Sequence, residues 1–168
     1  MAEAAFLHFA LAHGLRVAKP HGDSDPYDFL AGNGSHFWRV QVKSCACLLA
    51  NLMYQVGIGR HLGAPPSRRV IPYMPSEVDF IAIFLIPENS WYIVPIEVVD
   101  GRVGLSIHAR NHLKFGPWRP YLEAWSLLDQ TTERPVLPDP EPNTVSPRRR
   151  TRKSRSAQLL IVPRKENI

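Results

Sequence analysis

Hydrophobic and polar positions alternate most regularly over residues 37–43, which predicts a half-buried strand. Successive side chains of a strand point to opposite faces, so Trp38, Val40 and Val42 share one face. The opposite face carries Phe37, Arg39, Gln41 and Lys43. Asn33-Gly34, just before this strand, is typical of a tight hairpin turn. The pattern therefore predicts a hairpin whose first strand begins at residues 28–30.

The remaining elements follow from apolar periodicity and from turn residues. Residues 2–13 predict a helix that ends at Gly14, and residues 15–18 predict a short strand. Two further strands, at 79–86 and 91–96, are joined through Asn89-Ser90; the first is apolar almost throughout, which indicates a central strand. Residues 45–58 predict a helix or a core-lining loop, and residues 120–128 predict a closing helix. This order predicts an α/β fold, with a central mixed sheet of four to five strands flanked by helices.

Composition fits one ordinary domain. The chain has 168 residues, 45% of them hydrophobic, and no window approaches the ~18 apolar residues of a membrane span. No secretion signal is visible at the N-terminus, so we expect a cytoplasmic protein. Cys45 and Cys47 are the only cysteines, and no other pair of ligands at zinc-finger spacing joins them. Two small apolar side chains in a reducing compartment are the simpler interpretation.

The positive charge of the chain lies at one end. Residues 1–134 hold 12 Lys/Arg and 12 Asp/Glu, whereas residues 135–168 hold 8 Lys/Arg and 3 Asp/Glu, which accounts for the whole net charge of +5. We therefore expect a folded domain over 1–134, followed by a Pro-rich linker and a disordered basic tail over 135–168. The six clustered cations of the tail are Arg148, Arg149, Arg150, Arg152, Lys153 and Arg155. Such a run binds phosphates, acts as a localisation signal or remains solvated.

Three residues of the predicted hairpin combine the groups that phosphodiester hydrolysis needs. Mg²⁺ prefers carboxylate and other hard oxygen ligands, and a nearby cation stabilises charge on the phosphate. Gln41 and Lys43 share a strand face, and strand pairing would bring the Asp28 carboxylate beside Gln41. Asp23 and Asp25 compete for the same role, but both lie in the turn before the strand. Asp79 is expected to orient backbone or a basic side chain.

The sequence resembles the PD-(D/E)XK nuclease superfamily, in the branch near Holliday-junction resolvases and certain intron homing endonucleases. The resemblance spans about residues 1–128. It rests on Glu3, Asp25-Pro-Tyr-Asp28, Val40-Gln-Val-Lys-Ser44, Val78-Asp79-Phe80 and Trp91-Tyr-Ile-Val-Pro-Ile96. It implies a restriction-endonuclease-like core and an endonuclease that cuts branched or duplex DNA with Mg²⁺, or with Mn²⁺ as a substitute. It also implies assembly as a homodimer or homotetramer.

The same resemblance assigns roles to individual residues. Asp28 and Gln41 would bind the metal, the Val42 backbone carbonyl would complete the protein ligands, and Lys43 would position or activate the water. Glu3 would approach the metal from the first helix. The family usually has Glu or Asp where this chain has the neutral Gln41, so weaker metal binding is expected. A catalytically weak or inactive DNA-binding module therefore remains an alternative, as does a restriction-like or toxin-like effector.

Taken singly, these residues have simpler interpretations. Asp28 could cap a turn, Gln41 and Lys43 could form the solvated face of an edge strand, and Glu3 suits the dipole of a helix N-terminus without any catalytic role. Only their combination on neighbouring elements favours a nuclease.

Overall fold

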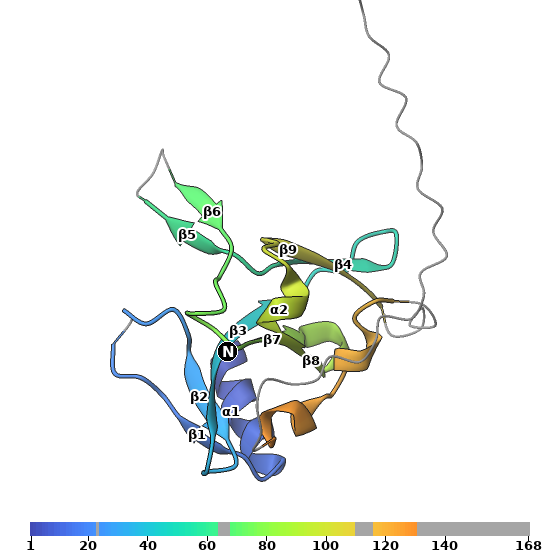
Figure 1. Ribbon diagram of the computed structural model, residues 1–168. Helices are drawn as coiled ribbons and strands as arrows, with labels where there is room; N and C mark the ends of the chain where they lie inside the picture. Colours follow the sequence, from blue (N-terminus) through green and yellow to red (C-terminus); the bar gives the residue numbers. More distant parts are fainter. Residues whose placement is uncertain (23, 64–67, 110–115, 131–168) are drawn as a thin grey trace, which may run out of the picture.

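A five-stranded mixed sheet forms the centre of the protein (Figure 1). The computed structural model describes residues 1–22, 24–63, 68–109 and 116–130. Across the sheet the order is β1-β2-β3-β7-β8. The bounds of these strands are β1 Arg16–Ala18, β2 Phe29–Gly32, β3 Phe37–Cys45, β7 Phe80–Leu85 and β8 Ser90–Pro95.

The apolar strand β7 lies between β3 and β8, as its sequence predicted. It pairs parallel with β3, with Val40 opposite Phe80, and antiparallel with β8. The other neighbours, β1–β2 and β2–β3, are antiparallel. The predicted hairpin around Asn33-Gly34 joins β2 to β3, and the Asn33 side chain accepts hydrogen bonds from the backbone N–H groups of Ser35 and His36. The predicted α/β fold class is therefore confirmed, with five strands in the main sheet.

Helix α1 (Ala2–Ala12) covers one face of the sheet. Its Phe6 is fully buried and stacks on Phe29 of β2, with ring centroids 5.2 Å apart. Trp38, Val40 and Val42 point into the same cluster, so the alternation of β3 buries the predicted face. The polar face of β3 consequently points to the other side of the sheet.

A second, smaller sheet packs against that other side. It pairs β4 (Met53–Gly57) with β9 (Gly104–His108), and its Tyr54 and Ile107 join the core formed with β7 and β8. A short helix α2 (Ile96–Val99) lies beside it. The prediction of a helix or a loop over residues 45–58 was therefore wrong, since this segment contains a strand. Its partner β9 lies about fifty residues further along the chain, so no local pattern marked the pairing.

The predicted closing helix over 120–128 was also wrong. Two 3₁₀ turns, η3 (Arg119–Tyr121) and η4 (Trp125–Leu128), replace it. Between them Glu123 has a left-handed backbone, with φ of 51°. The Glu123 carboxylate accepts hydrogen bonds from the backbone N–H of Trp91 and from the indole N–H of Trp125, which holds the break in place.

The remaining elements are short. A 3₁₀ turn, η1 (Ile86–Glu88), connects β7 to β8, and the strands β5 (Arg60–Leu62) and β6 (Arg69–Ile71) form a hairpin that projects from the body (Figure 1). None of the helices within the described ranges has the length and apolarity needed to cross a membrane. The proposed domain boundary at 134/135 and the basic tail lie outside the described residues.

Candidate active site

The β2–β3 hairpin places Asp28 and Gln41 side by side. Asp28 directly precedes β2, and its backbone N–H donates to the Val40 carbonyl at 2.9 Å, which extends the ladder by one residue. Phe29 is buried in the cluster under α1, so the Asp28 side chain points to the opposite face, the one that Gln41 occupies. Asp28 Oδ2 accepts hydrogen bonds from Gln41 Nε2 at 2.5 Å and from the Val42 N–H at 2.7 Å.

Gln41 is one of the few buried polar side chains of the described chain, with 7% of its surface exposed. Its amide nitrogen faces two acceptors, Asp28 Oδ2 at 2.5 Å and the Val42 carbonyl oxygen at 3.3 Å. Oxygen and nitrogen of a Gln amide have almost the same shape, and a half-turn of the amide exchanges them. After that exchange, one carboxylate oxygen, one carbonyl oxygen and one amide oxygen would converge on one point.

This donor set fits a hard divalent cation. Mg²⁺ takes oxygen ligands, commonly one or two carboxylates, with waters and substrate phosphates filling the remaining positions. The described residues contain no cluster of three or more His, Cys, Asp or Glu side chains that could form a different kind of metal site. Cys45 and Cys47 are free thiols, as the sequence suggested.

Lys43 lies two positions beyond Gln41 on the same face of β3. Its Nζ is 3.4 Å from the hydroxyl of Tyr73 and 5.4 Å from the centre of the Tyr73 ring. Burial lowers the pKa of Lys43, and the charge of Asp28 opposes that effect. Sequence reasoning missed Tyr73, because a single tyrosine between two prolines in a loop carries no periodic signal.

Asp28 is the electrostatic centre of the group. Burial raises its pKa most, and the nearby Glu3 carboxylate raises it further. The Val42 N–H and the charges of Lys43 and Lys19 lower the same pKa, but burial outweighs them. A bound cation would stabilise the ionised form of this partly buried carboxylate and so lower its pKa.

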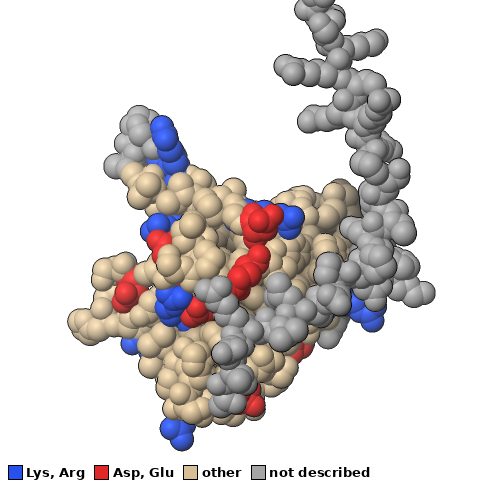
Figure 2. All heavy atoms as spheres, viewed as in Figure 1, with Lys and Arg blue, Asp and Glu red and all other residues tan. Residues whose placement is uncertain are grey.

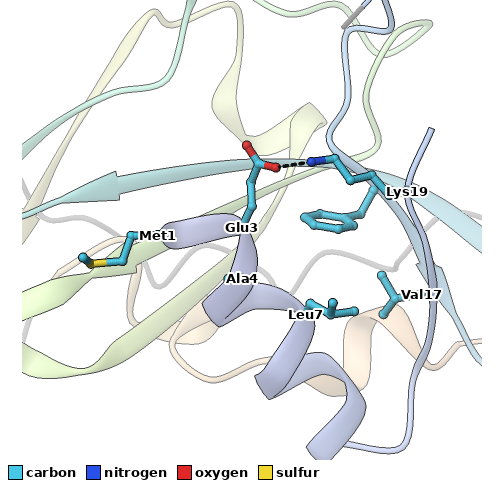
Figure 3. Close-up of a pocket in the computed structure, with 7 residues that line it drawn as sticks. Met1, Glu3, Ala4, Leu7, Val17 and Lys19 are labelled. Carbon is cyan, nitrogen blue, oxygen red and sulfur yellow. Dashed lines mark hydrogen bonds and ion pairs between the residues drawn. The ribbon is translucent and has the colours of Figure 1, made fainter. Parts of the chain in front are cut away.

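Glu3 stands beside this group and forms no hydrogen bond with Asp28 or Gln41. Its carboxylate is ion-paired with Lys19 at 2.7 Å, and both side chains are about half exposed. Figure 3 shows the pair at an open cavity of about 510 Å³ between α1 and the start of β2, where Phe29 also lies. The structure thus unites Asp28, Gln41 and Lys43 and leaves Glu3 at their border.

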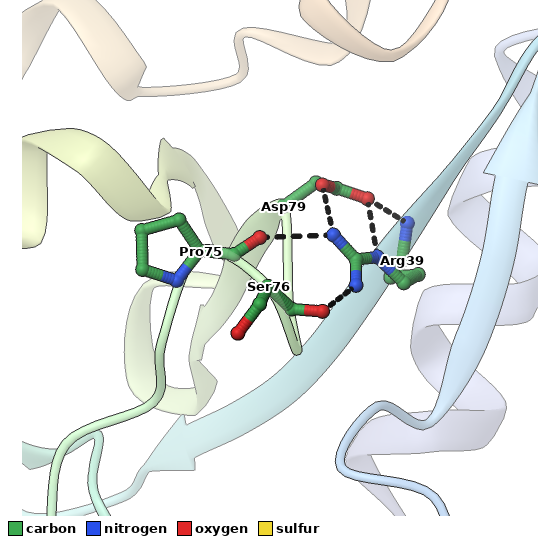
Figure 4. Close-up of polar contacts among 4 residues, drawn as sticks. All are labelled: Arg39, Pro75, Ser76 and Asp79. Atoms are coloured by element: carbon green, nitrogen blue, oxygen red, sulfur yellow. Dashed lines mark hydrogen bonds and ion pairs between the residues drawn. The ribbon is translucent and has the colours of Figure 1, made fainter.

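The competing carboxylates lie elsewhere. Asp25 is exposed in the turn before β2, and residue 23 is outside the described ranges. Asp79 binds Arg39: one carboxylate oxygen accepts from the backbone N–H and Nε of Arg39, and the other accepts from a terminal guanidinium nitrogen at 2.7 Å. The guanidinium also donates to the carbonyls of Pro75 and Ser76 (Figure 4). The expectation that Asp79 orients backbone and a basic side chain is confirmed.

Comparison with known proteins gives a family match. The model of one family, described as PD-(D/E)XK endonuclease, matches residues 1–115. The chain belongs to the PD-(D/E)XK endonuclease family. Nucleases of this family generally use divalent metal ions. A comparison with curated protein sequences gives no match.

Among solved structures, a bacterial homing endonuclease, I-Ssp6803I, is similar to this PD-(D/E)XK protein. The two share 25% sequence identity with a TM-score of 0.65, and the alignment covers 75% of this chain and 86% of the other. Family and neighbour together support nuclease activity and the fold. The basic side chains predicted to bind phosphates, Arg148–Arg150, Arg152, Lys153 and Arg155, lie outside the described residues.

Proposed function

We propose that the protein is a Mg²⁺-dependent DNA endonuclease whose active site is built on the β2–β3 hairpin. The observation that carries the proposal is the convergence of the Asp28 carboxylate, the Gln41 amide and the Val42 carbonyl, with Lys43 next on the same face. The structural neighbour is a homing endonuclease, and DNA is the substrate that this family implies.

Asp28, Gln41 and the Val42 carbonyl would hold the cation, with Mn²⁺ as a substitute for Mg²⁺. The cation would supply Lewis-acid activation of a water and of the scissile phosphate. Asp28 contributes the only full negative charge among these three ligands, because Gln41 is neutral. Glu3 would add a second carboxylate only if its ion pair with Lys19 broke and its carboxylate bound the metal instead.

Lys43 would orient the attacking water and stabilise the negative charge that develops on the phosphate. The Tyr73 hydroxyl accepts a hydrogen bond from the Lys43 ammonium and limits its movement on one side, and the Tyr73 ring lies within cation–π distance of it. Tyr73 is 8% exposed, so it also separates that side of Lys43 from water. In this scheme Tyr73 is a positioning residue.

The remaining parts of the proposal concern binding. The tail cations at 148–155 would contact phosphates along duplex or branched DNA. Two strands are cut most simply by two copies of one site, so we propose a homodimer or a homotetramer. Sedimentation of the purified protein with and without DNA measures that assembly, and a strict monomer in both conditions would refute it.

Cleavage of a labelled DNA duplex in Mg²⁺ tests the proposal, with D28A and K43A as the variants and D25N as the matched control. Asp25 is an exposed turn carboxylate three residues from Asp28, so D25N removes the same charge from the same segment. We expect D28A and K43A each to reduce cleavage by about 10²- to 10⁴-fold and D25N to leave it unchanged.

Two outcomes would contradict the proposal. Full activity in D28A would place the metal elsewhere. A parent protein that binds DNA but never cuts it, in Mg²⁺ or in Mn²⁺, would favour the alternative of an inactive DNA-binding module.

A further inference from the structure

The β5–β6 hairpin contributes little to the folded core. Its strands have three residues each and project from the body (Figure 1), and most of their side chains are exposed. Leu62 is 55% exposed and Val70 is 47% exposed. An isolated two-stranded hairpin is marginally stable in water. Its base is anchored by close packing, since a Cβ on Gly59 would lie 2.6 Å from Val70 and 2.9 Å from the Ile71 carbonyl.

Arg68 and Arg69 place two positive charges toward the outer end of this hairpin. Elsewhere in this region the cations are paired, Arg60 with Glu77 at 2.7 Å and Arg39 with Asp79 at 2.7 Å. Arg68 and Arg69 are exposed, and neither has an ion-pair partner among the described residues. Figure 2 shows Lys and Arg atoms gathered at the projecting end.

The chain links this hairpin directly to the candidate active site. Strand β6 ends at Ile71, and Tyr73, two residues later, lies with its hydroxyl 3.4 Å from Lys43 Nζ. Arg69 precedes Tyr73 by four residues, so their Cα atoms lie at most about 14 Å apart. That span corresponds to roughly four base pairs of axial rise in duplex DNA.

We propose that the β5–β6 hairpin is a DNA-binding element in which Arg68 and Arg69 contact phosphates a few nucleotides from the cleaved bond. This inference rests on the proposed endonuclease function and names a contact surface for its substrate. A two-stranded ribbon has dimensions that the major groove of duplex DNA admits. A second copy of this chain is the weaker candidate occupant, because a two-fold contact through the hairpin would bring Arg68 and Arg69 close to their own copies.

The test measures binding separately from cleavage. The full-length R68A/R69A variant is compared with R16A/R119A, which also removes two exposed arginines. Arg16 of β1 pairs with Gly32, at the far end of the β2–β3 hairpin from Asp28, and Arg119 lies in η3, next to the Leu122–Tyr92 bridge at β8. Fluorescence anisotropy of a fluorescein-labelled duplex, without divalent metal, gives Kd from about 50 to about 200 mM salt, an interval over which binding through several phosphate contacts changes by orders of magnitude.

We expect R68A/R69A to weaken binding and to flatten the slope of log K against log salt by about 1.8, because each phosphate that is no longer neutralised lowers the slope by about 0.9. The control variant should retain the parent slope. Cleavage by the control variant R16A/R119A at saturating DNA and Mg²⁺ should match the parent, because neither of these arginines touches Asp28, Gln41 or Lys43.

The outcomes separate this inference from the proposed function. If R68A/R69A has the same salt slope as the parent protein and still cleaves DNA, the role of the hairpin in DNA binding is overturned and the proposed endonuclease function stands. A flattened slope in a protein that never cleaves DNA supports the DNA-binding hairpin and overturns the endonuclease. Weaker self-association of R68A/R69A in sedimentation, with an unchanged salt slope, assigns the hairpin to an interface between copies of the chain and overturns its role in DNA binding.

Discussion

Replacing Asp28 with asparagine should stabilise the metal-free protein while removing its response to metal. Burial raises the pKa of the Asp28 carboxyl above its usual 3.8, so the folded protein binds the carboxyl proton more tightly than the unfolded chain does. Stability therefore falls as pH rises from 3.8 through the raised folded pKa, and the whole penalty is present once the pH exceeds the folded pKa. Asparagine never ionises and escapes that penalty.

Hydrogen bonding makes D28N the suitable variant for this test. Both bonds end on the same atom, Asp28 Oδ2, so an asparagine oxygen in that position would keep the bonds from the Val42 N–H and from Gln41 Nε2 without any rearrangement of the Gln41 amide. D28A would instead leave the Val42 and Gln41 donors without their acceptor, at a cost of about 1–3 kcal/mol each. D28N thus isolates the charge.

Metal binding supplies the measurable magnitude. A ligand that binds only the folded state stabilises it by about 2.7 kcal/mol at one hundred times its dissociation constant. For a chain of this size that corresponds to an increase in Tm of about 5–10 °C. We expect this increase in the parent protein and in D25N, and none in D28N.

Differential scanning fluorimetry at neutral pH, with EDTA and then with Mg²⁺ or Mn²⁺, measures both effects. D79N serves as the opposite control: it removes the charge that holds Arg39, so it should lower Tm in EDTA. The reasoning is refuted if D28N has a lower Tm than the parent in EDTA, or if it retains the full metal-induced increase.

Four further predictions concern the metal, the lysine, the ion pair and the tail. Q41E should tighten Mn²⁺ binding by at least about 1 kcal/mol, the Coulomb energy of two unit charges 4 Å apart in water, and isothermal titration calorimetry would show no change if Gln41 is not a ligand. Burial lowers the pKa of Lys43, so stability should rise with pH between its folded pKa and 10.5, and K43M should remove that rise in denaturation curves. R39M should cost about 2–3 kcal/mol in urea unfolding, because it strands a partly buried Asp79; a decrease below about 0.5 kcal/mol would contradict this. Deleting residues 148–168 should flatten the salt dependence of DNA binding by about 0.9 for each phosphate that the tail neutralises, and an equal slope would identify a solvated tail.

Local pattern was sufficient where partners are close in sequence. The alternation of residues 37–43 and the Asn33-Gly34 turn predicted the hairpin, and the hairpin alone brings Asp28 beside Gln41. The apolar run at β7 predicted a strand covered on both faces. Each inference needed only the two-residue period of a strand and a turn whose residues allow a positive φ.

Prediction failed where distant partners decide the local structure. Residues of β4 form a strand because they pair with β9, and the sequence of residues 45–58 does not indicate this distant partner. The segment 120–128 has helical periodicity, yet Glu123 adopts a left-handed backbone to bond with Trp91 and Trp125. Tyr73 reaches Lys43 through the same kind of long-range interaction.

The long crossover from β3 to β7 gives the two halves of the candidate site different resistance to local opening. Asp28, Gln41 and the Val42 carbonyl are held by the β2–β3 hairpin, which is closed where Phe29 pairs with Val40. Tyr73 lies in the crossover from β3 to β7, which is closed only where Val40 pairs with Phe80. Closing the longer loop costs about 1 kcal/mol more in chain entropy. Transient opening of the crossover would therefore detach Tyr73 from Lys43 while the oxygen ligands stay assembled. In mild denaturant, cleavage should disappear before metal affinity does.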